Sequence, residues 1–256
     1  MKAIDAHNER IIDQFSKQSV PFTKVPGHLD AIDTLVSMSG VRQMHTVLDV
    51  ACGPGIVSCE FAKIAEKVVG VDVTPAMLET AQRRQTELGL HNLVWERADA
   101  LSLPFADQTF DVVMTRYSFH HLLSPEAGFA EMIRVCKQGG VVLVADVAIP
   151  EQKVAYYDQL ERLRDPSHTH ALTELEFDRL YQSSDLTDCR YTSYTVDIEL
   201  EAQLNASFPN PGDTEIVRDL VARDVGVNSL GINARNIDGH IRYTVPIRVY
   251  TGRKEY

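Results

Sequence analysis

The stretch Val47-Leu-Asp-Val-Ala-Cys-Gly-Pro-Gly55 decides the fold of this chain. It is an apolar run that ends in a glycine-rich turn, and apolar residues with helical spacing follow directly behind it. A second apolar run at 68–73 comes next and carries Asp72. A strand, a tight glycine turn, a helix and a second strand with a terminal acid form the unit that holds a nucleoside-bearing cofactor at the carboxyl edge of a parallel sheet. The stretch therefore predicts an α/β core with a cofactor site.

The same alternation of strand and helix continues toward the C-terminus. Thr74-Pro75 and Ser124-Pro125-Glu126 each carry an N-cap residue followed by proline, which predicts helix starts at both places, and Gly139-Gly140 predicts a helix end. A loop is expected at 101–108 because Pro104 interrupts it. Strands are expected at 46–50, 68–73, 93–97, 110–115 and 141–146. Strands that alternate with helices predict a parallel sheet with right-handed crossovers.

The segments on either side of this core suggest one domain in four parts. Helical patterns at 4–15 and 29–38 precede the first strand; residues 1–45 are therefore either a lid over the cofactor edge or simple packing against the sheet. After the core at 46–150, helical patterns at 156–163, 174–181 and 216–225 and a strand pattern at 191–200 predict a substrate-cap region at 151–240. A C-terminal strand within 241–256 would pair with the late strand and complete a seven-stranded sheet.

Composition limits the class of protein and its partners. The chain has 256 residues and a net charge of −11, without a lysine- or arginine-rich run, which argues against nucleic acid or an anionic membrane surface as the main partner. No run of about 20 apolar residues predicts a membrane span, and no apolar signal core opens the chain. The four cysteines are scattered without pair or zinc spacing. We expect a cytoplasmic monomer or homodimer with free thiols that acts on a small molecule.

The glycine turn discriminates between cofactors. Dinucleotide enzymes use Gly-x-Gly-x-x-Gly, whereas this turn reads Gly53-Pro-Gly-Ile-Val-Ser58 and lacks the third glycine. Asp49 precedes the turn, and a carboxylate there suits an ammonium-bearing ligand better than a pyrophosphate. No Gly-Lys-Ser/Thr follows, so a Walker loop is excluded. A nicotinamide-dependent oxidoreductase is therefore disfavoured.

Five motifs in register carry a resemblance to a known family. They are Val47–Gly55, Gly70-Val-Asp72, Ala98-Asp-Ala100, Phe110-Asp-Val-Val113 and Gly139-Gly-Val-Val-Leu-Val144. Their order and spacing resemble those of class I S-adenosylmethionine-dependent methyltransferases of the type-11 group, which includes ubiquinone/menaquinone C-methyltransferase-like proteins. Arg116-Tyr-Ser-Phe-His-His121 and Arg162-Leu-Arg-Asp-Pro-Ser-His168 resemble a bacterial branch of that group. The resemblance implies a doubly wound, mostly parallel seven-stranded sheet with N-terminal helices and a helical insertion after strand five, and S-adenosyl-L-methionine as cofactor.

The resemblance also assigns roles to cofactor-binding residues. It places Asp49, Ala51, Gly53 and Gly55 at the methionine and ribose part of the cofactor, and Asp72 at the ribose diol. Val73 and Met77 would lie beside the adenine, and Asp99 and Ala100 at the adenine edge. Thr115 and Arg116 would lie near the transferable methyl group. Simple N-caps or solvated strand ends are the alternative for the acids, but three such acids at successive strand ends favour the cofactor site.

Residues after the fourth strand are the candidates for the chemistry. Methyl transfer from a sulfonium needs alignment and water exclusion, and needs a general base only if the acceptor must lose a proton. His120 and His121 are candidate bases because histidine titrates near neutral pH, with Arg116 as a further catalytic candidate. Because the two histidines are adjacent, one is expected to face the cleft and the other to pack. Stabilisation of the loop is the alternative for both, and no third ligand predicts a metal site.

The acceptor is less well defined than the cofactor. Candidate substrate-binding residues are Phe22, Tyr117, Arg164 and His168. The polar segment 162–170 fits substrate recognition and fits equally a salt-bridged junction between two helices, in which Ser167 or Thr173 caps the second. We expect methyl transfer to a carbon, oxygen, nitrogen or sulfur atom of a small molecule; a protein that binds the same cofactor without transferring a methyl group is the alternative.

Overall fold

The central sheet is the frame on which the site is built. The computed structural model describes residues 2–20 and 31–255, with only the backbone described for residues 2 and 3. The sheet order is β3-β2-β1-β4-β5-β8-β6, with β7 paired to β8. The strands are β1 (Thr46–Val50), β2 (Lys67–Asp72), β3 (Leu93–Arg97), β4 (Phe110–Arg116), β5 (Cys136–Val147), β6 (Leu186–Glu199), β7 (Arg235–Ile237) and β8 (His240–Lys254).

The first five strands form the parallel part of the sheet. β2 and β3 extend it on one side of β1, and β4 and β5 extend it on the other, all in parallel pairs. The helices α3 (Ile56–Ala62), α4 (Pro75–Glu87) and α5 (Pro125–Val135) connect these strands, whereas β3 passes to β4 through the predicted loop. The strand order reverses between β1 and β4, and ligands bind outside the carboxyl ends of the strands at such a point.

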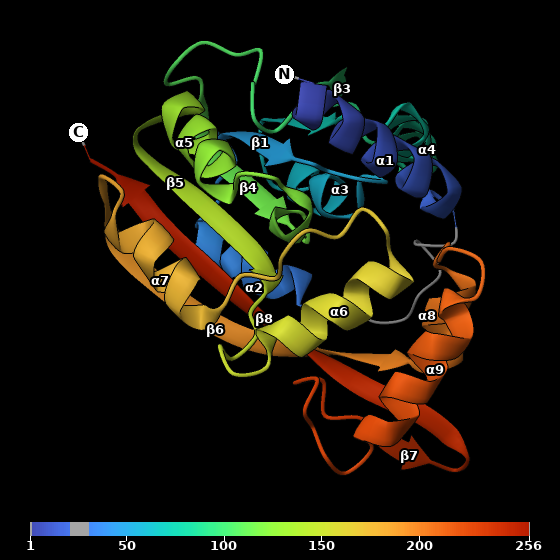
Figure 1. Cartoon of the computed structure of the whole chain (residues 1–256). Coiled ribbons are helices and arrows are strands. Elements are labelled where there is room, and N and C mark those ends of the chain that lie inside the picture. The colour runs from blue at the N-terminus through green and yellow to red at the C-terminus, as the bar shows by residue number, and fades with distance from the viewer. Residues whose placement is uncertain (1, 21–30, 256) are drawn as a thin grey trace.

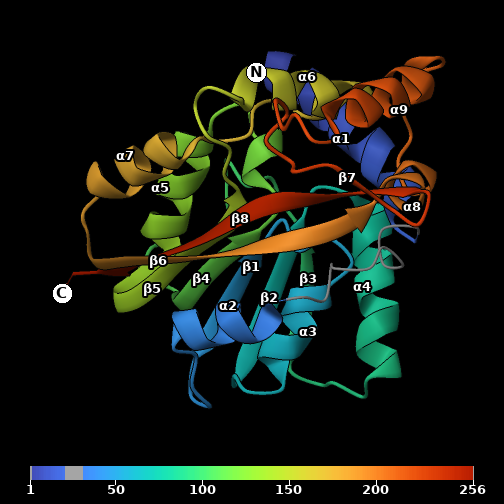
Figure 2. The same ribbon diagram turned by 90° about the horizontal axis from the view of Figure 1, so that it is seen from below.

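Apolar side chains alternate between the two faces of the sheet, as strand geometry requires. Val47 and Val112 pack on one face with α2 (Ile32–Ser39) and α3, whereas Leu48 and Val113 pack on the other with α5 and α7 (Glu174–Gln182). Figure 2 shows the two pairs of helices on opposite sides of the sheet. The doubly wound fold that the sequence predicted is confirmed.

The C-terminal half completes the sheet and adds a cap. β8 runs antiparallel between β5 and β6, so the two late strands supply the expected sixth and seventh members. The short β7, which the sequence analysis missed, adds an eighth strand as a hairpin on β8. A third apolar cluster joins α6 (Val154–Arg164) to the far ends of β6 and β8, together with α8 (Leu200–Asn205) and α9 (Asp213–Asp224). Figure 1 shows these helices gathered at one end of the molecule.

The N-terminal helix α1 (Lys2–Gln18) lies beside α4 (Figure 1). Its apolar members Ile11 and Phe15 face the pocket described below rather than a helix of the core. None of the helices in the described ranges combines the length and the apolar character that crossing a membrane requires.

Two local predictions are corrected. The helix expected to run to Lys137 ends at Val135, and β5 begins at Cys136 instead of after the glycine pair. Thr74 occupies the N-cap position of α4, but its side chain makes no capping bond. The carboxylate of Asp72 accepts the Thr74 backbone N–H at 2.8 Å instead, and so ties the end of β2 to the start of the helix.

Candidate functional site

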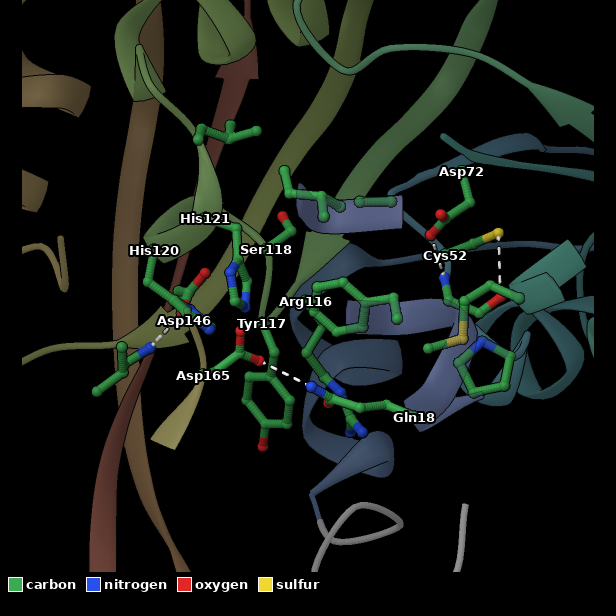
Figure 3. A pocket seen from close by; sticks show the side chains of 18 of the residues that line it. Gln18, Cys52, Asp72, Arg116, Tyr117, Ser118, His120, His121, Asp146 and Asp165 are labelled. Carbon is green, nitrogen blue, oxygen red and sulfur yellow. Dashed lines mark hydrogen bonds and ion pairs between the residues drawn. The ribbon is translucent and has the colours of Figure 1, made fainter. Parts of the chain in front are cut away.

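A pocket opens along the carboxyl ends of the parallel strands. Its walls come from the glycine turn, from the segments that follow β2 to β5, from α1 and from the C-terminal cap. Figure 3 shows Cys52 and Asp72 on one side, His120 and Asp146 on the other, and Arg116 between them. The pocket therefore joins the predicted cofactor edge to the residues predicted for the acceptor.

The glycine turn has a different role at each glycine. Ala51 and Gly53 both adopt left-handed backbone, with φ of 55° and 51°, and both line the pocket. A Cβ on Gly53 would meet nothing within 4 Å, whereas a Cβ on Gly55 would lie 2.7 Å from the Trp95 ring. Gly55 is outside the pocket lining. Gly53 thus leaves room for a ligand, and Gly55 allows α4 and β3 to pack closely.

Asp49 and Asp72 are two buried carboxyls at this end of the pocket. Burial raises the pKa of Asp49 to about 7, although the Ser58 hydroxyl, which donates to it at 2.5 Å, and the charge of Arg116 oppose the rise. Burial also raises the pKa of Asp72, and the Gly53 N–H donates to that carboxylate at 2.9 Å. Each carboxylate oxygen has a second lone pair, so both groups can accept further bonds from a ligand.

The third acid, Asp99, lies between the strand edge and α1. It accepts hydrogen bonds from the Leu101 N–H at 2.9 Å and from the Asn8 side-chain amide at 2.8 Å. Ala100 lines the pocket beside it, as do Val73 and Met77 on the far side of the turn. Apolar side chains beside a carboxylate are suited to a planar heterocycle with an exocyclic amine.

Thr115, Arg116 and Tyr117 connect the two halves of the pocket. The Thr115 hydroxyl is buried, donates to the Val50 carbonyl at 2.7 Å and shares a bond with Ser118; it stays outside the pocket lining. The Arg116 guanidinium lies 4.5 Å from the centre of the Tyr117 ring, and both residues line the pocket. Tyr117 has a φ of 58° and shares a hydroxyl–hydroxyl bond of 2.8 Å with Tyr194. The turn after β4 is therefore held in a rare backbone conformation by side-chain contacts.

His120 forms a dyad with an acid that the sequence analysis did not assign to the site. Its Nδ1 lies 2.6 Å from Asp146, at the end of β5, and that carboxylate also accepts the N–H groups of Phe119 and Val147. Burial acts to lower the pKa of His120, but the charge and the hydrogen bond of Asp146, together with the charge of Glu161, raise it above its ordinary value. His120 in turn helps to lower the pKa of Asp146 against its burial. The signal was present in the sequence, because Asp146 ends the strand next to the one that precedes His120.

His121 lies against the dyad but has a structural environment. Its Nδ1 is 3.1 Å from the Ser167 hydroxyl, its ring packs edge-on to Phe15, and its carbonyl lies 2.7 Å from Nε2 of His7. Burial and the neighbouring His120 lower its pKa to about 3, so the ring stays neutral at physiological pH. The structure therefore favours His120 over His121 as the base.

The polar segment 162–170 divides into two sets. Arg164 lines the pocket, where its guanidinium donates twice to the buried carboxylate of Glu161. His168 lies outside the pocket lining, and its Nε2 is 2.8 Å from Asp158, which also contacts His170. Thr173 caps α7 through a capping box, as the junction reading predicted. Arg164 thus remains a substrate-binding candidate, while His168 is surrounded by the contacts of a helix junction.

Two remaining predictions need only a short statement. Phe22 lies outside the described residues. Within residues 2–20 and 31–255, no group of three or more histidine, cysteine, aspartate or glutamate side chains is arranged to hold a metal ion.

The comparisons with known proteins agree with this geometry. A model of the family described as "Methyltransferase domain" matches residues 48–144. The uncharacterized methyltransferase YcgJ of Bacillus subtilis is 29% identical over 205 residues, which are 78% of this chain and 81% of YcgJ. Its crystal structure superimposes with a TM-score of 0.82, at 24% identity, over 90% of this chain and 100% of that one.

A second relative matches less than half of the chain. The ubiquinone/menaquinone biosynthesis C-methyltransferase UbiE of Saccharophagus degradans is 33% identical over 120 residues, which are 45% of this chain and 48% of that protein. The resemblance inferred from the sequence motifs is confirmed. Residues 48–144 therefore match the model of a methyltransferase domain, and the chain resembles methyltransferases in sequence and in fold.

Proposed function

We propose that this protein transfers the methyl group of S-adenosylmethionine to a small-molecule acceptor. The observation that carries the proposal is the continuous pocket, in which the buried carboxyls of Asp49 and Asp72 lie at one end and the His120–Asp146 dyad lies toward the other. S-adenosylmethionine supplies a methyl group that its sulfonium already activates. The protein has to align the donor with the acceptor and to exclude water.

The residues at the glycine turn fit the parts of this cofactor. Asp72 would accept from the ribose hydroxyls, because its two oxygens retain lone pairs after binding Gly53 and Thr74. Val73 and Met77 would pack against the adenine. Asp49, buried beside Arg116, would accept from the methionine ammonium.

The same reasoning assigns residues to the adenine edge and to the methyl end of the cofactor. Asp99 and Ala100 border the slot in which the adenine edge would lie. Arg116 lies where the two halves of the pocket meet, and so would stand beside the methionine moiety (Figure 3).

We further propose that the N-terminal residues act as the lid over this pocket. α1 is tied to three parts of the wall: Asn8 to Asp99, His7 to the carbonyl of His121, and Gln18 to Asp165 at 2.9 Å. A helix that bonds to the cofactor edge and also to the cap closes both halves together. Closure of this kind keeps water from the reacting groups.

Methyl transfer is tested directly with a labelled donor. The protein is incubated with S-adenosylmethionine that carries tritium in the methyl group and with a small-molecule extract of cells. Label in an acceptor that depends on the protein supports the proposal. Absence of labelled product, together with no thermal stabilisation by S-adenosylhomocysteine, would exclude it.

One observation favours a second candidate, a protein that binds the cofactor without methyl transfer. A solved structure of the cyclase SpnF has the same fold, with a TM-score of 0.60 and 19% identity over 89% of this chain. A scaffold of this kind is therefore found in a protein named for another reaction. The same assay separates the two, because the second candidate predicts tight binding of S-adenosylhomocysteine and no transfer of label to any acceptor.

A further inference from the structure

One apolar cluster lines the part of the pocket beside Tyr117, and we call this part the second chamber. Val196 and Ile198 of β6 and Val245 and Ile247 of β8 line it. These four side chains come from the two antiparallel strands of the cap, outside the region that matches the methyltransferase domain. An acceptor that fills this chamber would bury apolar surface, which favours binding.

The charged groups around the chamber already have partners within the protein. Arg164 pairs with Glu161 at 2.5 Å, and His120 pairs with Asp146 at 2.6 Å. The buried Asp165 accepts from Gln18 and Ser167, and the charge of Arg164 helps to lower its pKa against burial. An ionic acceptor would lose its hydration and would meet only charged groups that already have partners, so an uncharged acceptor is favoured.

Three polar groups of the chamber lack hydrogen-bond partners. In the described part of the chain, the hydroxyls of Tyr157 and Tyr243 make no hydrogen bond, although both residues are about 95% buried (4% and 3% exposed). The Oε1 atom of Gln203 is buried without a partner as well, and all three residues line the pocket. A buried polar atom is normally satisfied, so Gln203 Oε1 points to a polar group on the ligand. The two tyrosine hydroxyls are not fully buried and can bond to the same ligand.

His120 presents one ring nitrogen to the same space. Nδ1 is occupied by Asp146, and among residues 2–20 and 31–255 no side chain or backbone group bonds to Nε2. The side chain is 14% exposed and lines the pocket. Asp146 is held by two backbone N–H groups, so it fixes the ring in the orientation that leaves Nε2 available.

We propose that the second chamber binds an uncharged, largely apolar acceptor that carries a phenol or enol hydroxyl, and that His120 removes the proton of this hydroxyl as its oxygen is methylated. The inference rests on the proposed methyl transfer and specifies its acceptor. Tyr157, Tyr243 and Gln203 bind a second polar group of the acceptor, and Asp146 is a positioning residue for His120.

The step balances in atoms and charge. The O–H bond of the acceptor breaks and its proton passes to Nε2 of His120. The oxygen forms a bond to the methyl carbon as the carbon–sulfur bond breaks, and the electron pair of that bond stays on sulfur. The positive charge of the sulfonium is lost, and the His120 ring becomes a positively charged imidazolium beside Asp146. The proton passes to water after the products leave.

A base would serve no purpose for several other acceptors. A carboxylate or a thioether already has a lone pair that can attack the methyl group. An alkylamine is a cation in neutral solution, and the partnered charges of the chamber would not favour its binding. A weakly acidic hydroxyl gains most, because imidazole accepts a proton efficiently when the two pKa values are not far apart.

Three compounds with one carbon skeleton test the acceptor class. Methyl salicylate is a neutral phenol, salicylate adds a carboxylate charge, and methyl anthranilate replaces the hydroxyl by an uncharged amine. With tritiated donor we expect label on the phenol oxygen of methyl salicylate, at least about tenfold slower transfer to salicylate, and none to the amine. Equal or faster transfer to salicylate or to the amine, label on a ring carbon, or no transfer to the phenol by protein that binds S-adenosylhomocysteine would overturn the inference. Failure to bind S-adenosylhomocysteine would instead contradict the proposed function.

Variants of the dyad test the role of His120. We expect His120→Gln to lower kcat for methyl salicylate at least about 100-fold while the Kd for S-adenosylhomocysteine changes less than twofold. His91→Gln, at an exposed position away from the pocket, is the control and should match the wild type. Unchanged kcat in a folded His120→Gln protein would contradict the assignment.

The pH dependence of kcat shows whether Asp146 positions His120 or only stabilises the fold. The groups that face His120 are Asp146, Glu161, Arg164, His121 and His168. Because Asp146 raises the pKa of His120, Asp146→Asn should shift the rising limb of kcat to lower pH, whereas a merely destabilised protein would keep its midpoint. A midpoint that does not move would contradict the positioning role.

Tyr243→Phe should raise the KM for methyl salicylate while kcat stays within twofold of the wild type. An unchanged KM would contradict the contact of Tyr243 with the acceptor.

Discussion

Asp49 is a residue whose ionisation should follow ligand binding. Its pKa is raised to about 7 by burial, so about half of the molecules hold the proton at pH 7. A ligand ammonium favours the ionised carboxylate and lowers that pKa, so binding should release up to about half a proton at pH 7, more at pH 6 and less at pH 8. Calorimetric titration of S-adenosylhomocysteine in buffers with different ionisation enthalpies measures this number. The same proton release in Asp49→Asn would show that another group is responsible.

Asp72 connects the glycine turn to α4 and lines the pocket, so its charge should matter for the affinity of the proposed cofactor. Asp72→Asn keeps the shape but removes the charge from bonds that are worth about 1.5–3 kcal/mol. We expect S-adenosylhomocysteine to bind about 10- to 100-fold more weakly in calorimetry. Asp219→Asn, at an exposed ion pair on α9, is the matched control. Equal affinity in the two variants would rule out a ligand contact for Asp72.

Single residues of the pocket could be predicted from the sequence where a local pattern defines them. Asp49 and Asp72 follow from the strand ends that carry them, and both line the pocket. The role of Gly55 differs from the prediction, because only the packing of Trp95 shows what its missing side chain avoids. The Asp146 partner of His120 was missed, because a contact between the ends of two parallel strands depends on their register in space.

At the scale of elements, α1 is the part whose contribution is easiest to isolate. Asn8 and Gln18 donate to carboxylates on the two halves of the pocket wall. In an Asn8→Ala/Gln18→Ala variant both acceptors lose a bond, and we expect S-adenosylhomocysteine to dissociate at least about tenfold faster. Asp13→Ala/Lys17→Ala removes an exposed ion pair from the same helix and should leave the rate unchanged. Equal dissociation rates in stopped flow would contradict the lid.

Packing between β2 and β3 depends on a glycine. A Cβ on Gly70 would lie 2.5 Å from the ring of Trp95, the single tryptophan of the chain. Gly70→Ala should therefore cost about 1–3 kcal/mol of unfolding free energy, measured by urea denaturation. The cost should shrink in a Trp95→Leu background, where the clash is removed, when each protein is followed by circular dichroism. The same cost in both backgrounds would show that the ring is not its source.

Helices and strands with strong local sequence signals were predicted more accurately than those with weak signals. The strands 46–50 and 93–97 agree with β1 and β3 to the residue, because each begins with apolar or β-favouring residues directly after a polar stretch. β6 begins at Leu186 rather than at 191, since its exposed first half has no apolar alternation and becomes a strand only by pairing with β8. α8 was missed because Glu199 ends β6 and caps the helix directly, without an intervening loop.

At the scale of the whole molecule, two halves of different character share one pocket. The parallel half, which carries the matched domain, supplies Asp49, Asp72 and Asp99. The antiparallel strands and α6 supply the second chamber, and α1 bonds to both halves. We infer that the first half determines the methyl donor and the second the acceptor, which explains why the sequence motifs were informative about the donor only.

The most direct test of this account is one calorimetric titration series. S-adenosylhomocysteine and NAD are each titrated into the wild-type protein and into Asp72→Ala. The account predicts one bound S-adenosylhomocysteine per chain in the wild type, binding at least about tenfold weaker in Asp72→Ala, and no heat from NAD. Binding of NAD without binding of S-adenosylhomocysteine, or an affinity for S-adenosylhomocysteine that Asp72→Ala leaves unchanged, would contradict it.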